Sequence, residues 1–583
     1  MMTNYRKILA LWGYGIMEEL RRNGITKVII SPGSRSTPLV IAAARHPEIE
    51  TVIAYDERGA AYYALGYARA TGKPAVLIST SGTAVANYYP AVIEASMAHI
   101  PMIIISADRP PELIDTGANQ TIRQPGMFGD YLRWSVNLPV PDEIIDSTYL
   151  LSTIDHGYYR SVYPDPGPVH LNMMFRKPLE PAALSTQDIH SFFPSDWIKE
   201  SGPYKRHLTG NNSEFSDELV QIADQWKHEY NRPLLLIGEL PFKSKQRNQL
   251  QTLLKQLQLP FWLDSTTGIG VDSPHHFHSL DLLLSNEHFS DSFTPDLIIQ
   301  IGKRPTSGRL EKFVKDNQIP VIHLNTSIQR SDPNHRVRTE WHVSVETIFH
   351  ILQNLSTWNP DESYLSFVQR WNRRGWEQIQ HGLTQEKNLT EWHLPGAILP
   401  KIPVDAPLFV ASSLSIRLLD IFKGSGERVI NLGANRGVSG IDGTIAGAIG
   451  FAAGGGKSTW VLMGDLAFIH DMNSLHLLKS IRDIQLIFIV INNRGGHIFD
   501  LLPVRNEKDV FDPFFVTPHK YEFKAAAEQF QLDYHLIKDL ISLNNVLGSV
   551  EQASNHTLLE IDIDSSESTR VYNYLISTIR NLL

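Results

Sequence analysis

Residues 459–465, TWVLMGD, and residues 486–493, LIFIVINN, are two apolar runs that each end in polar side chains. Short continuous runs of this kind are typical of buried strands in a parallel sheet. Ligands of an open α/β sheet bind beyond the carboxyl ends of its strands, so we expect Asp465 and the asparagine pair to lie together there. The 28 positions from Asp465 to Asn493 leave room for one crossover helix, which we place at about residues 471–481.

The polar groups at these two strand ends are suited to bind a divalent cation. Mg²⁺ prefers oxygen ligands and commonly holds phosphates as well. Asp465 offers a carboxylate, an asparagine offers a side-chain carbonyl, and the glycine-rich turn that follows offers a backbone carbonyl. Spacing does not separate Asn492 from Asn493, so both are candidates. Either half alone is more typical of a turn without a ligand, but the two together predict a metal and phosphate site.

The rest of the chain repeats the alternation of strand-like runs and helix-length segments. Such runs include KVIIS, TVIAY, AVLIST and PMIIIS, then PLLLIGE, DLIIQIG and VIHLN, and finally PLFVAS, RVINLG and TLLEIDI. β-branched runs separated by helical segments indicate parallel sheets. We therefore predict an α/β fold with three doubly wound parallel-sheet domains at residues 1–185, 215–355 and 364–583. A Pro/Ser/Asn-rich stretch at 181–215 is interpreted as a linker, and STWNPDES at 356–363 as the second boundary.

Composition narrows the class of protein. At 583 residues the chain exceeds the size of one hydrophobic core, about 250–300 residues. Its net charge of −9 argues against a nucleic-acid surface, which needs a basic stripe. The absence of cysteine excludes disulfides, thiolate nucleophiles and cysteine-ligated metals. No apolar run approaches the ~18–20 residues of a membrane span, and the N-terminus is typical of a capped helix without a signal peptide. We expect a cytoplasmic enzyme.

Three other motifs do not indicate a binding site. GFAAGGGKST at 450–459 lacks the glycine that a phosphate-binding loop needs five residues before Gly-Lys-Ser, so residues 443–456 are predicted as a small-residue helix packed on a sheet. No strand is followed by the G-x-G-x-x-G pattern of dinucleotide-binding proteins. SPHHFHS at 273–279 is predicted to be a solvated loop rather than a metal site.

Glu57 follows the strand-like run TVIAYD and begins a segment rich in Ala, Gly and Tyr. A carboxylate at a helix N-terminus is stabilised by the helix dipole, so a simple cap is one interpretation. A lone carboxylate at a strand end is also a candidate for proton transfer. On its own, the residue favours the cap.

Several arginines follow the predicted strands. Each alone is typical of a surface residue, but Arg is well suited to bidentate binding of carboxylates. Together they indicate a site for a polyanionic small molecule. The set comprises Arg35, Arg109, Arg309, Arg417 and Arg436.

The Gly-Asp and Asn-Asn pair, separated by about 25–30 residues, resembles the Mg²⁺-diphosphate motif of thiamine-diphosphate enzymes; Leu466 is a mild departure, because many relatives have glycine there. The resemblance extends over the whole chain. The chain is similar to the branch of that family that acts in menaquinone biosynthesis. The sequence motifs that carry this resemblance are SPGSRSTPL, DERGAAYYALGYA, TSGTAVANYYPAVIEA, ADRPPEL, GANQTIRQ, NRGVSGIDG and NNRGGHIFDLLP.

The resemblance implies thiamine diphosphate and Mg²⁺, or Mn²⁺, as cofactors. It implies that Glu57 bonds the aminopyrimidine ring, that Ile441 supports the bent cofactor, and that Gly464 lies at the diphosphate. It implies Asp465, Asn493 and the backbone of Gly495 as metal ligands. It implies catalytic roles for Glu57, Gln120, Arg35 and Arg436. The substrate side is expected to include Ser34, Arg35, Arg109, Gln120, Arg309, Ser413, Arg417 and Arg436, with Ile498 and Phe499 as an apolar wall.

The same resemblance implies an activity and an assembly. The expected transferase decarboxylates 2-oxoglutarate and adds the remaining carbanion to isochorismate in a conjugate addition. The expected assembly is a homo-oligomer, either dimer or tetramer, with active sites between subunits. Two alternatives remain: another thiamine-diphosphate lyase of the acetolactate-synthase or 2-oxo acid decarboxylase type, and a non-catalytic regulatory protein that binds a cofactor.

Overall fold

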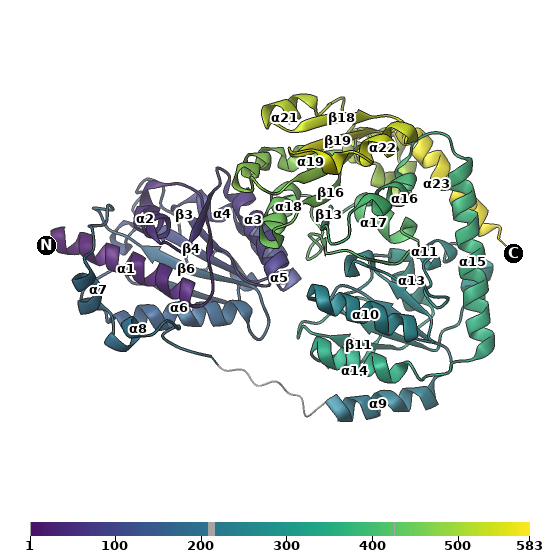
Figure 1. The fold of residues 1–583 in the computed structure, drawn as a ribbon, viewed down its shortest axis with the longest axis horizontal. Coiled ribbons are helices and arrows are strands. Elements are labelled where there is room, and N and C mark those ends of the chain that lie inside the picture. Colours follow the sequence, from purple (N-terminus) through teal and green to yellow (C-terminus); the bar gives the residue numbers. More distant parts are fainter. Residues whose placement is uncertain (1, 208–215, 425, 583) are drawn as a thin grey trace. The chain divides into compact units, whose positions relative to one another are not determined.

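The computed structural model describes residues 2–207, 216–424 and 426–582 (Figure 1). The chain divides into two compact units. The first contains residues 1–209, 435–459 and 467–486, and the second contains the remaining segments. The three domain ranges predicted from the sequence stay a prediction.

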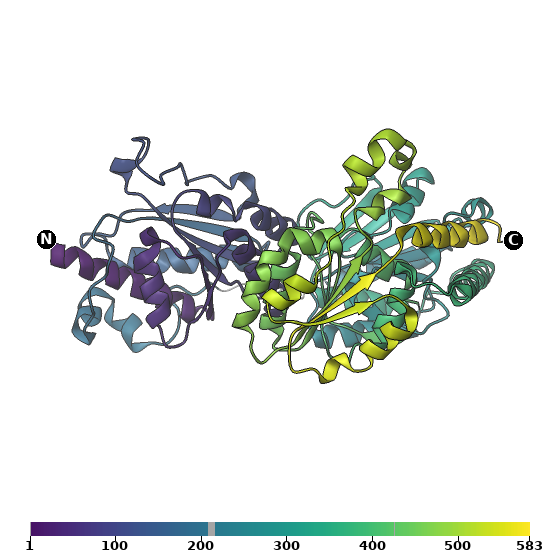
Figure 2. The same ribbon diagram turned by 90° about the horizontal axis from the view of Figure 1, so that it is seen from above.

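The first unit contains a sheet of six parallel strands in the order β2-β1-β3-β4-β6-β5. The strands are β1 (Lys27–Ile30), β2 (Glu50–Ile53), β3 (Val76–Ser79), β4 (Met102–Asp108), β5 (Trp134–Leu138) and β6 (Pro168–Met174). The helices of its N-terminal segment are α1 (Met2–Arg22), α2 (Thr37–Arg45), α3 (Glu57–Thr71), α4 (Thr83–Ala86), α5 (Tyr89–Ala98), α6 (Ser147–Val162), α7 (Thr186–Phe192) and α8 (Ser195–Lys199). The apolar sides of α1 and α6 pack together with the sheet in one core (Figures 1 and 2).

The second unit contains a central sheet of five parallel strands in the order β12-β11-β10-β7-β8. The strands are β7 (Pro233–Ile237), β8 (Phe261–Leu263), β10 (Leu297–Ile301), β11 (Val321–Asn325) and β12 (Val337–His342). The helices are α9 (Ser216–Glu229), α10 (Ser244–Gln256), α11 (Leu280–Leu283), α12 (Glu287–Ser292), α13 (Gly308–Asp316) and α14 (Val345–Leu355). A two-stranded antiparallel ribbon pairs β9 (Ile269–Gly270) with β14 (Arg428–Val429).

The C-terminal sheet has six strands in the order β15-β13-β16-β17-β19-β18. The strands are β13 (Leu408–Val410), β15 (Leu432–Gly433), β16 (Thr459–Gly464), β17 (Leu486–Asn492), β18 (Asp533–Ile537) and β19 (Thr557–Asp562). The helices of this part of the chain are α15 (Glu362–Gln385), α16 (Leu394–Ile398), α17 (Leu414–Phe422), α18 (Thr444–Gly455), α19 (Asp465–Asp471), α20 (Lys508–Phe511), α21 (Lys524–Gln529), α22 (Leu540–Leu547) and α23 (Ser565–Arg580).

Each of the three sheets reverses its winding direction after its second strand. In each, the first strand is followed in the chain by a neighbour on one side, and the later strands are added on the other side. This reversal defines a doubly wound sheet and opens a crevice at the carboxyl ends of the two strands that flank it. The predicted α/β fold class is confirmed. In the C-terminal sheet the reversal lies between β13 and β16, which places Asp465 beside it.

Two predicted helices differ from the sequence expectation. The crossover after β16 does not begin at about residue 471, because α19 starts at Asp465 itself and continues as a 3-10 helix, Met472–Ser480. The Asp465 carboxylate is favoured there by the helix dipole. The small-residue helix α18 does not pack mainly on a sheet, because its glycines lie against α3.

Two loop predictions also need correction. Part of the 181–215 stretch is folded as α7 and α8, with Ser185 and Asp188 forming a capping box and Trp197 buried. Residues 208–215 lie outside the described residues. The SPHHFHS loop is not solvated: His276 is fully buried and stacks on Phe261, with ring centroids 5.3 Å apart. Burial holds the pKa of His276 well below its usual value.

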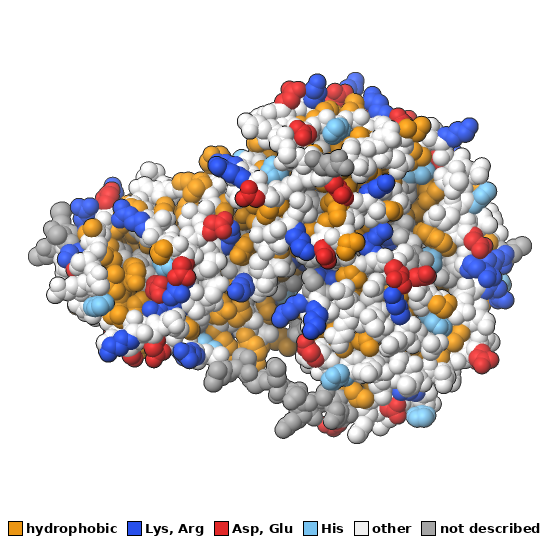
Figure 3. Space-filling model, viewed as in Figure 1, with side chains coloured by type: hydrophobic (Ala, Val, Ile, Leu, Met, Phe, Trp, Pro, Cys, Tyr) orange, Lys and Arg blue, Asp and Glu red, His pale blue; other side chains and the backbone are white. Residues whose placement is uncertain are grey.

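The distribution of surface charge and the lengths of the helices relate to the expectations about nucleic-acid binding and membrane spans. Cationic and anionic side chains are interspersed on the face drawn in Figure 3. Within the described residues, no helix is both long and apolar enough to cross a bilayer, and no cluster of three or more His, Asp or Glu side chains is arranged to hold a metal.

The contact between α3 and α18 yields the first prediction. A Cβ on Gly66 would lie 1.9 Å from the carbonyl oxygen of Gly447, so Gly66→Ala must push two helix backbones apart. We expect a loss of about 1–3 kcal/mol in unfolding free energy, measured by urea denaturation. Gly455→Ala on α18 is the matched control, because its Cβ would meet no atom within 4 Å. Equal stability of the two variants would contradict the close packing.

Candidate functional site

The carboxyl end of β16 is tied to the turn after β17 by one carboxylate. Asp465 is 2% exposed. Its Oδ1 accepts from the Leu466 amide at 2.6 Å, and its Oδ2 accepts from the Gly495 amide at 2.9 Å. Asp465 thus joins two neighbouring strand ends, as the sequence predicts. Burial raises the pKa of this carboxyl, and the two backbone amides and His519 oppose that rise.

His519 is a neighbour of Asp465 that the sequence analysis missed. Its Nδ1 accepts from the Tyr521 amide at 3.2 Å, which leaves Nε2 as the protonated nitrogen of the neutral ring. Nε2 lies 3.2 Å from Asp465 Oδ2 and donates to it. His519 is 54 positions beyond Asp465, in a loop without periodic signal, so only the folded chain reveals the contact.

The two adjacent asparagines have different environments. Asn492 donates from Nδ2 to the buried carboxylate of Glu560 at 2.6 Å, and its Oδ1 accepts from the Arg494 amide at 3.3 Å. Asn493 donates from Nδ2 to Glu391 at 2.9 Å. No donor to Asn493 Oδ1 is found in the described part of the chain. The contacts therefore commit Asn492 to the fold and leave the carbonyl of Asn493 available as a ligand.

The glycines of this edge have distinct reasons to be glycine. Gly495 has φ 151°, and a Cβ there would lie 2.5 Å from the carbonyl oxygen of Val516. A Cβ on Gly464 would meet no atom within 4 Å, so the backbone beside Asp465 faces open space. The following 3-10 helix, His497–Leu501, presents Ile498 and Phe499, both half-buried; the Phe499 ring packs edge-on against Phe515 at 5.5 Å.

Glu57 is the first residue of α3, at the edge of the N-terminal sheet. The capping role belongs to its neighbour Asp56, whose Oδ1 accepts from the Arg58 amide at 2.9 Å. Apart from its own backbone amide, the described residues offer no hydrogen-bond donor to the Glu57 carboxylate. Burial raises the pKa of Glu57, and Asp56 adds to the rise. Asp56 and not Glu57 is therefore the N-cap of α3, and the half-buried Glu57 carboxyl lies in the first turn with only its own amide as a donor within the part of the chain that the structure describes.

Arg35 and Arg109 lie close together at the carboxyl ends of β1 and β4. Arg35 is 4% exposed and donates to the carbonyl of Phe175 at 2.6 Å. Burial lowers the pKa of Arg35, and the charge of Arg109 lowers it further, because the two cations repel each other. Arg109 donates to the carbonyl of Asn119 at 2.9 Å. Ser34 opens the short 3-10 helix that carries Arg35.

Gln120 lies in the loop that faces the end of β3. It has φ 57° and donates from Nε2 to the carbonyl of Ser81 at 3.1 Å. A Cβ on Gly82 would lie 2.9 Å from its side chain. A non-glycine residue with positive φ is a strained conformation that the surrounding contacts must hold, and such strain is frequent at functional sites.

Two arginines of the second unit have different settings. Arg417, on α17, donates to the carbonyl of Ser413 at 2.6 Å, and Ser413 itself has φ 67° at the end of β13. Arg309 donates to Asp281 at 2.6 Å and to the hydroxyl of Tyr572 at 2.5 Å. Burial opposes its charge, but Asp281 and Tyr572 outweigh that and hold the pKa of Arg309 above its usual value. These contacts favour a structural role for Arg309.

The loop 435–443 of the first unit carries the two remaining candidates, Arg436 and Ile441, which are both half-buried. The structure thus groups Ser34, Arg35, Glu57, Arg109, Gln120, Arg436 and Ile441 in the first unit. It groups Arg309, Ser413, Arg417, Gly464, Asp465, Asn493, Gly495, Ile498 and Phe499 in the second.

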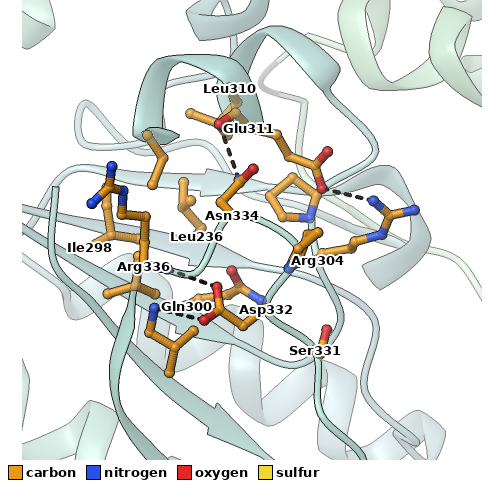
Figure 4. Close-up of a pocket in the computed structure, with 15 residues that line it drawn as sticks. Leu236, Ile298, Gln300, Arg304, Leu310, Glu311, Ser331, Asp332, Asn334 and Arg336 are labelled. Atoms are coloured by element: carbon orange, nitrogen blue, oxygen red, sulfur yellow. Dashed lines mark hydrogen bonds and ion pairs between the residues drawn. The ribbon is translucent and has the colours of Figure 1, made fainter. Parts of the chain in front are cut away.

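A separate pocket opens beside β10 in the central sheet and encloses about 420 Å³, open to solvent (Figure 4). Two of its acidic side chains already have partners: Glu311 lies 3.2 Å from Arg304, and Asp332 accepts from the backbone amide of Arg336 at 2.9 Å. Among the described residues that line it, none belongs to the predicted site.

Comparison with known proteins places these features in a family. Residues 13–127 match the profile described as "Thiamine pyrophosphate enzyme, N-terminal TPP binding domain", and residues 194–410 match "Middle domain of thiamine pyrophosphate". A 2-succinyl-5-enolpyruvyl-6-hydroxy-3-cyclohexene-1-carboxylate synthase of Chlorobium phaeobacteroides is 38% identical over 592 residues, covering 100% of this chain and 99% of the relative.

Two further relatives carry the same name. That of Rubrobacter xylanophilus is 38% identical over 574 residues, with 97% of each chain covered. That of Chlorobium limicola is 40% identical over 539 residues, covering 91% of this chain and 90% of the relative. This chain belongs to that synthase family. The family resemblance seen in the sequence motifs is thereby confirmed, as is the class of enzyme, one with a thiamine-pyrophosphate-binding domain.

The different contacts of the two asparagines yield the second prediction for this synthase family member. Asn493→Ala should weaken Mg²⁺-dependent binding of thiamine diphosphate at least about tenfold, because a hard-cation ligand is lost. Asn492→Ala should spare that binding but cost about 1–3 kcal/mol of stability, because the buried Glu560 loses a donor. Titration calorimetry and chemical denaturation measure the two effects. The reverse pattern would make Asn492 the ligand.

Proposed function

We propose that this chain decarboxylates 2-oxoglutarate and adds the remaining four-carbon unit to isochorismate, with one CO₂ leaving for each product formed. The observation that carries the proposal is the Asp465–Gly495 link, which joins the ends of β16 and β17 beside the reversal of the C-terminal sheet. The near-full-length similarity to synthases named for this product supports it.

The residues at that link fit a divalent cation and a diphosphate. Asp465 contributes a carboxylate already oriented by two backbone amides, and Asn493 contributes a carbonyl whose amide nitrogen is held by Glu391. Gly495 contributes a backbone carbonyl in a turn that only glycine adopts easily. Mg²⁺ or Mn²⁺ suits this all-oxygen donor set. Gly464 leaves room beside it for phosphate oxygens.

Glu57 is assigned to the aminopyrimidine ring. When bound, thiamine diphosphate supplies a carbon nucleophile and stabilises the carbanion left by decarboxylation. The Glu57 carboxyl holds or moves a proton at the ring nitrogen, a task for which a pKa raised by burial is suited. Ile441 is assigned to the apolar support of the cofactor.

The substrate side is assigned to the cationic groups that follow the strands. Both substrates carry carboxylates, and charge-assisted bonds from Arg are the strong, directional way to hold them. Arg35 and Arg109 share one sheet edge, and Gln120 adds a neutral donor beside it. Arg417 with Ser413, and Arg436, are assigned to the same substrates, with Ile498 and Phe499 as the apolar wall. Arg309 stays a prediction, and its ion pair with Asp281 favours a structural role instead.

We also propose a homo-oligomer, dimer or tetramer, in which the complete site forms between subunits. The support is the family resemblance, and sedimentation analysis of the purified chain tests it. The cytoplasmic location stays a prediction.

The reaction itself yields the third prediction. Purified full-length chain with thiamine diphosphate, Mg²⁺, 2-oxoglutarate and isochorismate should release CO₂ in equal amount to a product that retains the enolpyruvyl group, followed by mass spectrometry. Replacing 2-oxoglutarate by pyruvate should abolish product formation. Preferred use of pyruvate would favour an acetolactate-synthase type, and cofactor binding without any turnover would favour a regulatory protein.

Glu57 yields the fourth prediction. Glu57→Gln should lower kcat by about 10²-fold or more, the usual scale of a general acid–base group. Cofactor affinity should fall by only about tenfold or less, since one hydrogen bond is weakened rather than lost. Steady-state kinetics and calorimetry separate the two effects.

Asp56→Asn is the matched control, because it removes the adjacent charge while asparagine still caps the helix. The kcat of Asp56→Asn should stay within about twofold of wild type, because asparagine and aspartate are about equally favourable at a helix N-cap. Similar kinetics for the two variants would refute the assignment of Glu57.

A further inference from the structure

The loop 435–443 has a conformation that its own sequence does not enforce. Ser439 has φ 62° although it is not glycine, and Gly443 has the same φ against the ring of Tyr62. Residues 436–442 lie between β15 and α18 and belong to no strand, so no sheet pairing fixes them. Contacts from other elements of the first unit must therefore hold the loop in place.

Glu94 supplies the most direct of these contacts. It lies on α5 and is 1% exposed. Its Oε1 accepts from the Gly437 amide at 2.7 Å, and its Oε2 accepts from the Val438 amide at 2.7 Å. One carboxylate thus binds two successive backbone amides, directly after Arg436. Bonds of this kind to an ionised acceptor are about twice as strong as neutral ones.

The fit between α5 and the loop is close on the backbone side as well. A Cβ on Gly437 would lie 2.6 Å from the carbonyl oxygen of Glu94 and 3.0 Å from the Ala98 amide. Any larger residue at 437 would have to move away from the helix. The loop can therefore approach the Glu94 carboxylate only because glycine stands at this position.

A buried carboxylate is costly unless it is paired and hydrogen-bonded. Arg69 on α3 lies 3.8 Å from Glu94 Oε1, and the two side chains are 8% and 1% exposed. The chain thus buries an ion pair where α5 needs no charge for its own helix. A second contact, from the Tyr62 hydroxyl to Asp442 at 2.5 Å, holds the far end of the loop.

We propose that Glu94 is a positioning residue, which fixes the backbone of loop 435–443 so that Arg436 is held in its substrate-binding place. This inference rests on the proposed function, because it gives Arg436 an acidic substrate. Glu94 itself touches the loop backbone and acts through Arg436.

The test is Glu94→Gln in the full-length chain. Glutamine keeps the shape but turns one acceptor into a donor that faces a backbone amide. Hydrogen–deuterium exchange should speed up in the peptide that spans residues 435–443, and the KM for at least one acidic substrate should rise about tenfold or more. The change in kcat should be smaller, and cofactor affinity should stay within about threefold.

Glu19→Gln is the matched control. Glu19 is also fully buried in the first unit, and it accepts from the Trp197 indole at 2.5 Å and from the Tyr204 amide at 2.6 Å. The Glu19→Gln variant should leave both the hydrogen–deuterium exchange of residues 435–443 and the KM unchanged. Gly437→Ala is the second variant: its Cβ would push the loop away from α5, so it should reproduce the Glu94→Gln kinetics even if that variant folds poorly.

A double-mutant cycle decides whether Glu94 acts through Arg436. In an Arg436→Ala background, Glu94→Gln should add no further rise in KM, whereas independent sites would add. Unchanged exchange in the 435–443 peptide, unchanged KM or an additive cycle would overturn the inference. Wild-type kinetics of Arg436→Ala alone would instead show that the substrate assignment of Arg436 in the proposed function is wrong.

Discussion

A hydrogen bond from the Gly495 amide to the Asp465 carboxylate is the interaction on which the candidate site depends. It joins the ends of β16 and β17, beside the reversal of the C-terminal sheet. The bond needs a glycine whose φ other residues avoid, and it needs a carboxylate with little exposure to water. Both requirements suit a polyvalent cation, because the negative charge is oriented and poorly solvated before any ligand arrives.

Buried carboxylates that accept hydrogen bonds from backbone amides also occur elsewhere in the fold. Glu94 binds the amides of loop 435–443, Asp471 binds the Ala446 amide at the start of α18, and Asp264 binds the Thr306 amide after β10. Each carboxylate is almost fully buried and holds a segment that no sheet pairing fixes. These buried charges are tolerated because several backbone amides donate hydrogen bonds to them. The bonds fix the loop backbones, and the desolvation of the carboxylates is the energetic cost.

Much of the fold could be predicted from residue patterns. Apolar runs with helix-length spacing identify parallel sheets, and polar residues after these runs mark Asp465, Asn493 and Arg35 as strand-end groups. The ends of helices and the burial of individual side chains could not be predicted from these patterns. The crossover helix begins at Asp465, and His276 is buried rather than solvated. In each case a tertiary partner overrides the local pattern.

The sequence by itself determined the α/β class, the family and the positions of the candidate groups, because hydrophobic period and strand-end motifs are local properties. Only the tertiary structure decided which of two adjacent asparagines keeps its side-chain carbonyl available, that Asp56 rather than Glu57 caps α3, and that Arg309 is paired with Asp281. It also revealed His519 and Glu94. These depend on hydrogen bonds between residues far apart in the chain, and no spacing rule encodes such partners.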